Sequence, residues 1–150
     1  MKRELGFAQP ACDVLVTRAV PALLDAPERR EPLLAQLSDD ERERYARFHF
    51  DRDRLVFLVA HALVRQTIGQ LAGVAPSALS FTKLEHGRPE IAGPEPARAL
   101  RFNLSHTHGL VICAVSRGPA AVGADVEHVD RRVELLSVAK GVFSARELEG

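Results

Sequence analysis

The spacing of hydrophobic residues is helical in the first half of the chain and alternating in the second. Over residues 51–71 the apolar positions recur at intervals of three and four, which predicts one long amphipathic helix. A shorter helix is predicted at residues 31–37, and a capping box at Ser38–Glu41 then starts another, which continues through Tyr45 and Phe48. The first half of the domain is therefore expected to be mainly helical.

Short stretches in which apolar and polar residues alternate, typical of half-buried strands, occur before and after these helices. Strands are predicted at residues 12–17, 79–84, 100–105, 110–115 and 121–126. Turns at His108-Gly109 and Arg117-Gly118-Pro119 separate the last three strands, and a further helix is predicted at residues 135–143. The order of elements predicts an α+β fold in which helices pack on a small, mostly antiparallel sheet.

Composition places the chain among soluble globular proteins that form one compact unit. It has 150 residues, 46% of them hydrophobic, and 20 basic against 20 acidic side chains, a balance that argues against a general nucleic-acid binder. The two cysteines, Cys12 and Cys113, are too far apart in spacing for a disulfide scaffold or a zinc site. No signal peptide is visible and no stretch approaches the ~20 apolar residues of a membrane span, so a cytoplasmic location without membrane association is expected.

Arginines are concentrated in residues 41–54, where they alternate with acidic residues. They are Arg42, Arg44, Arg47, Arg52 and Arg54. Such a cluster leaves room for a small anion site on one face of the helices. The same residues could also form a solvated surface with i,i+4 ion pairs.

Two carboxylates in the last part of the predicted sheet form a pattern that suits metal chemistry. Asp125 and Glu127 lie two positions apart on a predicted strand, so their side chains point to the same face while Val126 points to the core. Two hard oxygen ligands can then converge on a Mg²⁺ ion that also contacts substrate phosphates; a solvated strand edge is the structural alternative. Glu147 could add a third ligand or a base, although Ser144–Glu147 also fits a capping box.

Ser105 and His106 are neighbours on a predicted strand and therefore face opposite sides, which argues against a nucleophile–base pair. His106 and His108 could share a zinc ion, but no further Cys, His or Asp lies at a familiar spacing. Gly87-Arg88-Pro89 stands between two strands and has the composition of a tight turn.

Four segments, taken in order, resemble the motifs of the Sfp-type 4′-phosphopantetheinyl transferase family. They are Gly87-Arg88-Pro89, Phe102-Asn103-Leu104-Ser105-His106-Thr107, Gly123-Ala124-Asp125-Val126-Glu127 and Phe143-Ser144-Ala145-Arg146-Glu147. Residues 44–48, 53–54 and 57–65 are similar to the helical signature of the same family. The resemblance implies an enzyme that uses coenzyme A and Mg²⁺ to transfer 4′-phosphopantetheine to a serine of an acyl or peptidyl carrier protein, releasing adenosine 3′,5′-bisphosphate.

The resemblance also implies roles for individual residues. Asp125 and Glu127 would bind Mg²⁺ against the coenzyme A pyrophosphate, and Glu147 would complete the cation site and help to deprotonate the carrier serine. Ser105 and His106 would contact the coenzyme A phosphates, with His106 at the 3′-phosphate and among the catalytic residues. Basic side chains on the helices would make further contacts with coenzyme A, namely Arg44, Arg47 and Arg54. A turn formed by Gly87, Arg88 and Pro89 would line its adenine side.

The chain departs from the family pattern in two places. The family has a basic residue near the start of the second helix, where this sequence has Glu41, and it follows its third carboxylate with Trp-x-x-Lys-Glu, which this sequence lacks. Family members consist of two similar α/β halves with the active site between them, so the resemblance implies a first half at residues 1–118, the start of a second at 119–150, and a truncated domain. A fragment that binds coenzyme A without turnover is therefore one alternative, and a Mg²⁺-dependent phosphodiesterase or nuclease is a less favoured one.

Overall fold

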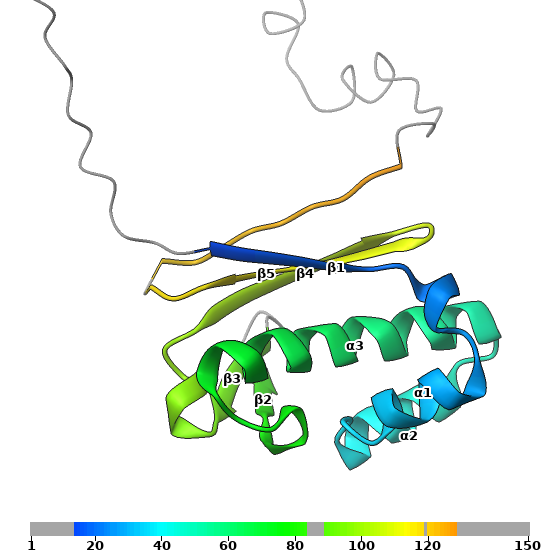
Figure 1. Ribbon diagram of the computed structural model, residues 1–150, viewed down its shortest axis with the longest axis horizontal. Helices are drawn as coiled ribbons and strands as arrows, with labels where there is room; N and C mark the ends of the chain where they lie inside the picture. Colours follow the sequence, from blue (N-terminus) through cyan, green and yellow to red (C-terminus); the bar gives the residue numbers. More distant parts are fainter. Residues whose placement is uncertain (1–13, 84–88, 119, 129–150) are drawn as a thin grey trace, which may run out of the picture.

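The computed structural model describes residues 14–83, 89–118 and 120–128. One long helix, α3, lies along one face of a three-stranded antiparallel sheet (Figure 1). The sheet contains, in spatial order, β1 (Val14–Ala19), β5 (Leu110–Ser116) and β4 (Arg101–Thr107). The helices are α1 (Pro27–Leu34), α2 (Asp39–Arg47) and α3 (Asp51–Ala72), with short 3₁₀ turns η1 (Pro21–Leu24), η2 (Pro76–Ala78) and η3 (Glu95–Ala97). A separate two-stranded ribbon is formed by β2 (Ser80–Lys83) and β3 (Pro89–Gly93).

The α+β fold and the main helices agree with the predictions from sequence. α3 occupies the predicted long helix and ends at Gly73, whose φ of 68° is the left-handed conformation that glycine adopts most easily. The capping box of α2 is formed, because Glu41 N donates to Ser38 Oγ at 3.3 Å and Ser38 N donates to Glu41 Oε2 at 2.9 Å. α1 begins at Pro27 rather than at residue 31, since proline fits the first turn of a helix, where the N–H group needs no helical partner.

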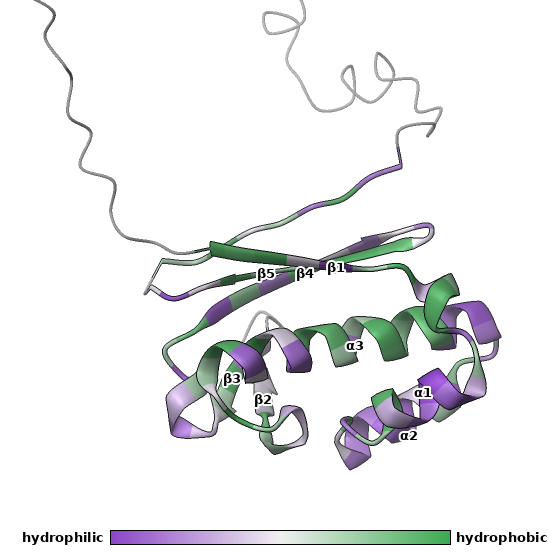
Figure 2. Cartoon of the chain, viewed as in Figure 1, coloured by the Kyte–Doolittle hydropathy of each residue, from purple (hydrophilic) through white to green (hydrophobic). Residues whose placement is uncertain are grey.

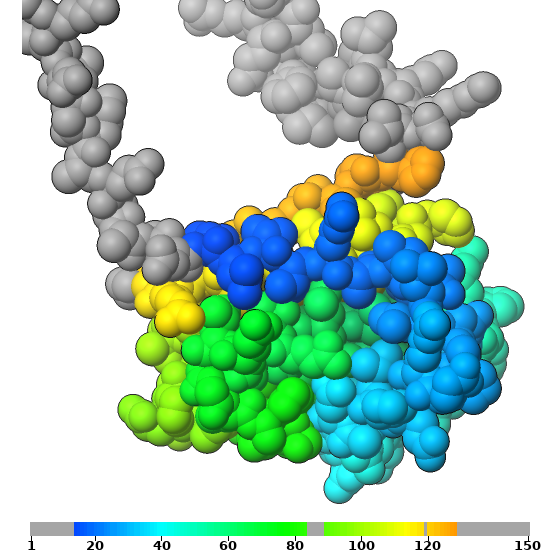
Figure 3. All heavy atoms as spheres, in the orientation of Figure 1, coloured from blue at the N-terminus to red at the C-terminus, as the bar shows by residue number. Residues whose placement is uncertain are grey.

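The strands differ from the prediction in two places. The expected strand at residues 121–126 is wrong: these residues form an extended segment on the side of the sheet away from α3, without joining its ladder (Figures 1 and 3). The backbone of this segment bonds to side chains of β4 and not to the backbone of a neighbouring strand. Ala124 N donates to Asn103 Oδ1 at 3.1 Å, and Val126 N donates to Ser105 Oγ at 3.2 Å. β3 was missed because it is five residues long and begins with a proline, which gives a weak strand signal. The helix predicted at 135–143 lies outside the described residues.

Both parts of the hydrophobic core are built on α3, which is hydrophobic over most of its length, whereas α1 and α2 are more polar (Figure 2). Leu58 packs with α1 and with Val111 of β5, and Ile68 packs with Leu79 and Phe102 at the other end of the helix. Each such buried side chain contributes roughly 1.5–3 kcal/mol. By length and composition α3 could also cross a membrane, contrary to the expectation that no stretch is apolar enough, but 61% of its most apolar window is buried inside the domain.

Candidate functional site

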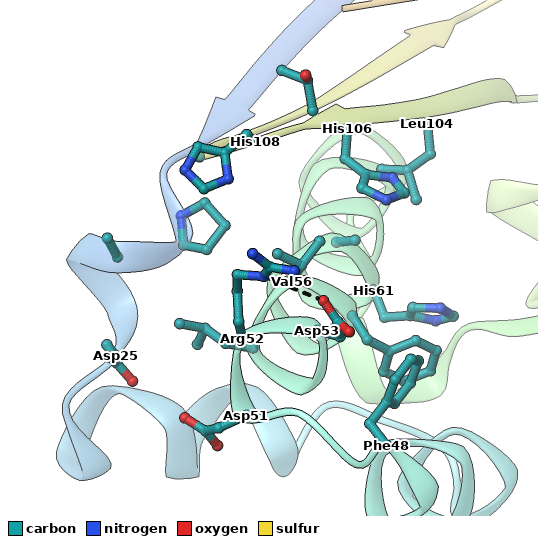
Figure 4. Close-up of a pocket in the computed structure, with 17 residues that line it drawn as sticks. Asp25, Phe48, Asp51, Arg52, Asp53, Val56, His61, Leu104, His106 and His108 are labelled. Atoms are coloured by element: carbon teal, nitrogen blue, oxygen red, sulfur yellow. Dashed lines mark ion pairs between the residues drawn. The ribbon is translucent and has the colours of Figure 1, made fainter. Parts of the chain in front are cut away.

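A groove of about 980 Å³ opens where the first turns of α3 face η1 and the turn between β4 and β5 (Figure 4). Apolar side chains, including Val56 and Leu104, form part of its wall. Three imidazoles border it: His61 of α3, His106 of β4, and His108 of the β4–β5 turn. A concave site with apolar walls and a few polar groups is the usual form of a small-molecule binding site.

The aspartates at this groove are paired with arginines. Arg30 bonds both Asp25 and Asp51, and its Nη1 and Nη2 lie 3.0 and 2.7 Å from the two carboxylate oxygens of Asp51. The hydrogen bond from Arg30 keeps the pKa of Asp51 below its ordinary value. Arg52 Nε lies 3.5 Å from Asp53 Oδ1, the ion pair drawn in Figure 4. These pairs reduce the repulsion that the carboxylates would exert on an anionic ligand.

Behind the groove, Glu41 of α2 holds two side chains of α3. Its Oε1 accepts a hydrogen bond from His61 Nδ1 at 2.8 Å, and its Oε2 accepts one from Arg65 Nε at 2.9 Å. The same oxygen forms an ion pair with Arg65 Nη2 at 2.8 Å. Arg65 is only 1% exposed and also donates through Nη1 to the carbonyls of Pro76 and Leu79. Arg65 therefore lies in the core of the domain, because these acceptors satisfy its guanidinium there.

The ionisation of Glu41 follows from the same contacts. Burial acts to raise its pKa, but the hydrogen bond with His61, the bond from the Ser38 backbone N–H and the charge of Arg65 together lower the pKa to about 2. An ionised carboxylate only accepts hydrogen bonds, so the proton shared with His61 belongs to Nδ1. The spacing of His61 and Arg65, one helical turn apart on α3, is the sequence signal that could have indicated a common partner.

Ser105 and His106 lie on opposite faces of β4, as the strand alternation predicts. His106 is exposed and borders the groove (Figure 4), whereas Ser105 faces the extended segment. Ser105 Oγ donates to Asp125 Oδ1 at 2.9 Å and accepts from Val126 N at 3.2 Å. The hydroxyl of Ser105 therefore fixes the position of the Asp125 carboxylate.

Asp125 and Glu127 are presented on the same side of the extended segment. Both are exposed, whereas Ala124 and Val126 are half-buried, so the predicted alternation is present although the strand is not. Exposed carboxylates at this spacing suit Mg²⁺, which takes one or two carboxylates and completes its shell with water and phosphate oxygens. In the part of the chain that the structure describes, no cluster of three or more His, Cys, Asp or Glu side chains forms a metal site. Glu147, the predicted third ligand, lies outside the described residues.

The three helical arginines predicted as coenzyme A contacts, Arg44, Arg47 and Arg54, are not among the residues that line the groove. The guanidinium of Arg44 lies over an aromatic ring of α3, 5.3 Å from the ring centre. Arg47 forms an i,i+4 ion pair on α2 at 3.1 Å, as in the solvated-surface alternative. Arg54 Nη2 donates to the carbonyl of Phe48 at 2.7 Å and so ties the start of α3 to the end of α2. Their contacts with coenzyme A stay a prediction.

The predicted turn on the adenine side is only partly visible. Gly87 and Arg88 lie outside the described residues. Pro89 is the first residue of β3, where it pairs with Lys83 of β2. It also borders a second, smaller hollow of about 100 Å³, which Arg98 helps to line. This hollow shares no residue with the groove at α3.

The known proteins whose sequences are similar to this chain belong to one family. The family model described as "4'-phosphopantetheinyl transferase, N-terminal" matches residues 26–118. The 4'-phosphopantetheinyl transferase HetI of Nostoc sp. (strain PCC 7120) is 35% identical over 127 residues, which are 84% of this chain and 53% of that protein. The 4'-phosphopantetheinyl transferase Sfp of Bacillus subtilis (strain 168) is 32% identical over 120 residues, 80% of this chain and 50% of that protein. The chain thus spans about half the length of these relatives.

A solved structure with the same fold is the Helicobacter pylori holo-[acyl-carrier-protein] synthase in complex with coenzyme A. The two chains superpose with a TM-score of 0.53 at 13% sequence identity, over 69% of this chain and 97% of that one. At this identity the likeness concerns the fold, and it supports the α+β arrangement of a helical layer on a small antiparallel sheet.

Proposed function

This chain belongs to the 4′-phosphopantetheinyl transferase family, and on that premise we propose that it takes part in the Mg²⁺-dependent transfer of 4′-phosphopantetheine from coenzyme A to a serine of an acyl or peptidyl carrier protein. The described residues support the donor side of this reaction, namely the binding of coenzyme A and the placing of its phosphates. The widely spaced cysteines support a cytoplasmic location for it.

The observation that carries the proposal is the pair of neighbouring side chains near the end of β4. β4 is the last strand in the order β1-β5-β4, so within the described residues its outer edge has no partner strand. His106 borders the groove on one face, and Ser105 holds Asp125 on the other. A ligand with phosphates at two positions can pass this edge and contact both faces. Coenzyme A, which has a 3′-phosphate and a pyrophosphate, is such a ligand.

On the face away from the groove, Asp125 and Glu127 would bind Mg²⁺ beside the pyrophosphate. The bound ion would supply positive charge where phosphate oxygens become more negative. The contribution of the chain itself is to orient the carboxylate of Asp125, through the hydroxyl of Ser105 and through the anchoring of the segment by Asn103. Preorganised ligands of this kind avoid reorganisation when the substrate binds.

The transfer is tested with the 150-residue chain, an apo carrier protein, coenzyme A and Mg²⁺, by measuring the gain of phosphopantetheine in the mass of the carrier. Asp125→Asn is the informative variant, because asparagine keeps an oxygen for the Ser105 hydroxyl and removes the charge. Asp40→Asn, at an exposed carboxylate on α2, is the matched control. We expect transfer by the wild type and the control, and transfer about 100-fold slower with Asp125→Asn.

Calorimetry of coenzyme A binding, with and without Mg²⁺, tests the donor site separately. Binding by the wild type that is strengthened by Mg²⁺ is the expected result. A well-folded chain that does not bind coenzyme A would contradict the donor site. Binding without any gain of carrier mass would contradict transfer by this chain alone while leaving the donor site intact.

A further inference from the structure

His61 is the groove imidazole whose orientation the structure explains most completely. Its Nδ1 is bonded to Glu41 at 2.8 Å, and its ring stacks on Phe57 with 4.0 Å between ring centres. The side chain of His61 is 26% exposed to solvent, and it borders the groove (Figure 4). Glu41 in turn cannot turn away, because Arg65 and the capping box of α2 hold its other oxygen. The ring is therefore held by Glu41 and Phe57 and remains partly exposed at the groove.

The anchoring of Nδ1 determines what the rest of the ring can do. Because the ionised Glu41 accepts the Nδ1 proton, Nε2 is the ring nitrogen that is left to contact a ligand. A neutral Nε2 offers a lone pair, and a protonated Nε2 offers an N–H donor that carries positive charge. Only the protonated form favours an anion, by a charge-assisted hydrogen bond.

The charged groups around His61 are largely paired with one another. Those that face it or the adjoining groove are Glu41 and Arg44 of α2, Asp51, Arg52, Asp53 and Arg65 of α3, Asp25 beside η1, and His106 and His108 of the β4 end. Glu41 pairs with Arg65, Arg52 with Asp53, and both Asp25 and Asp51 with Arg30. A proton added to Nε2 therefore makes this part of the groove more positive, and an anion bound there would favour that protonation.

We propose that His61 is a second imidazole contact, beside His106, for a phosphate of the ligand, and that Glu41 is the positioning residue that holds its ring toward the groove. The proposal rests on coenzyme A as the ligand. In this proposal the role of Glu41 differs from that of a basic residue at the same position. Its negative side chain does not contact the phosphate itself but holds His61, which does. Binding of the phosphate is expected to take up a proton at His61.

Calorimetry with coenzyme A at several pH values tests the contact. His61→Asn is the variant of choice, because the amide N–H can replace Nδ1 toward Glu41 while the Nε2 end of the ring is removed; His49→Asn, at an exposed histidine that does not border the groove, is the matched control. At about pH 6 we expect His61→Asn to bind coenzyme A about ten-fold more weakly than the wild type, and His49→Asn to bind like the wild type. The wild-type affinity should fall toward that of His61→Asn as pH rises to about 8.

The same titrations with 3′-dephospho-coenzyme A identify the phosphate. A loss limited to coenzyme A assigns His61 to the 3′-phosphate, and an equal loss with both ligands assigns it to the pyrophosphate. Equal binding by His61→Asn and the wild type at about pH 6, with either ligand, would overturn the contact. If the wild type bound neither ligand, the proposed function itself would fail, which is a different result.

The role of Glu41 is tested by NMR titration of the His61 ring in the wild type and in Glu41→Gln. Glutamine keeps the shape and removes the charge that faces the protonated ring, so the NMR titration of His61 in the variant should differ from that in the wild type. Proton uptake on coenzyme A binding, measured in buffers of different protonation enthalpy, should also decrease near neutral pH. An unchanged His61 titration in a folded variant would show that Glu41 does not act through this ring.

Discussion

Replacing Glu41 by glutamine should mainly remove a charge from the junction of α2 and α3. Glutamine can still accept from the Ser38 N–H, so the capping box is kept. It cannot balance the guanidinium of Arg65, which is 1% exposed. Loss of one partner from a buried ion pair costs about 3–5 kcal/mol. Since Arg65 keeps its bonds to two backbone carbonyls, we expect a loss at the lower end, about 3 kcal/mol of the free energy of unfolding at neutral pH.

The pH dependence provides an independent test of the same charge. The pKa of Glu41 is lowered from 4.5 to about 2 in the folded state, so its charged form stabilises the fold fully above pH 4.5, and this contribution is lost as pH falls toward 2. The shift corresponds to about 3 kcal/mol, which solvent access to the carboxylate reduces to about 2 kcal/mol. The wild type should lose this amount over the acid range, and Glu41→Gln should not.

The assay is urea unfolding, followed by circular dichroism, at a series of pH values between about 2.5 and 7. Glu43→Gln, at an exposed carboxylate of the same helix, is the control and should change stability by less than about 0.5 kcal/mol. A difference between wild type and Glu41→Gln of less than about 1 kcal/mol at neutral pH would refute the buried-pair argument. A larger difference that stays constant down to about pH 3 would refute the assigned ionisation of Glu41.

Two further predictions concern the core around α3. A Cβ at Gly69 would lie 2.7 Å from the carbonyl oxygen of Val74, so Gly69→Ala should lower the free energy of unfolding in urea by about 1–3 kcal/mol. Gln70→Ala, at the exposed neighbouring position, is the control and should not lower it. Equal unfolding midpoints for the wild type and Gly69→Ala would contradict this close approach. Cys113 is fully buried, and burial raises its pKa to about 12, so in a Cys12→Ser background a thiol reagent should label the chain only after denaturant is added. Rapid labelling of the native chain would show that β5 is not covered as described.

Local signals in the sequence were sufficient for the helices and for most strands. The three-and-four spacing of apolar residues predicted α3, and Ser38 with Glu41 predicted the start of α2, because both patterns depend on neighbours within a few residues. The alternation at residues 121–126 also predicted which side chains are exposed. It could not show whether a second strand lies within reach, and here the side chains of Asn103 and Ser105 take that place.

The candidate site was predictable in its residue types and less so in its arrangement. The order of the motifs indicated the family. It also predicted Ser105, His106, Asp125 and Glu127 as residues that contact coenzyme A or Mg²⁺. The sequence by itself thus determined the fold class and the chemistry to be expected. Only the tertiary structure decided that His61 borders the groove and that Glu41 points inward, because a hydrogen bond between residues 20 positions apart depends on how α2 packs against α3, and no local pattern records that packing.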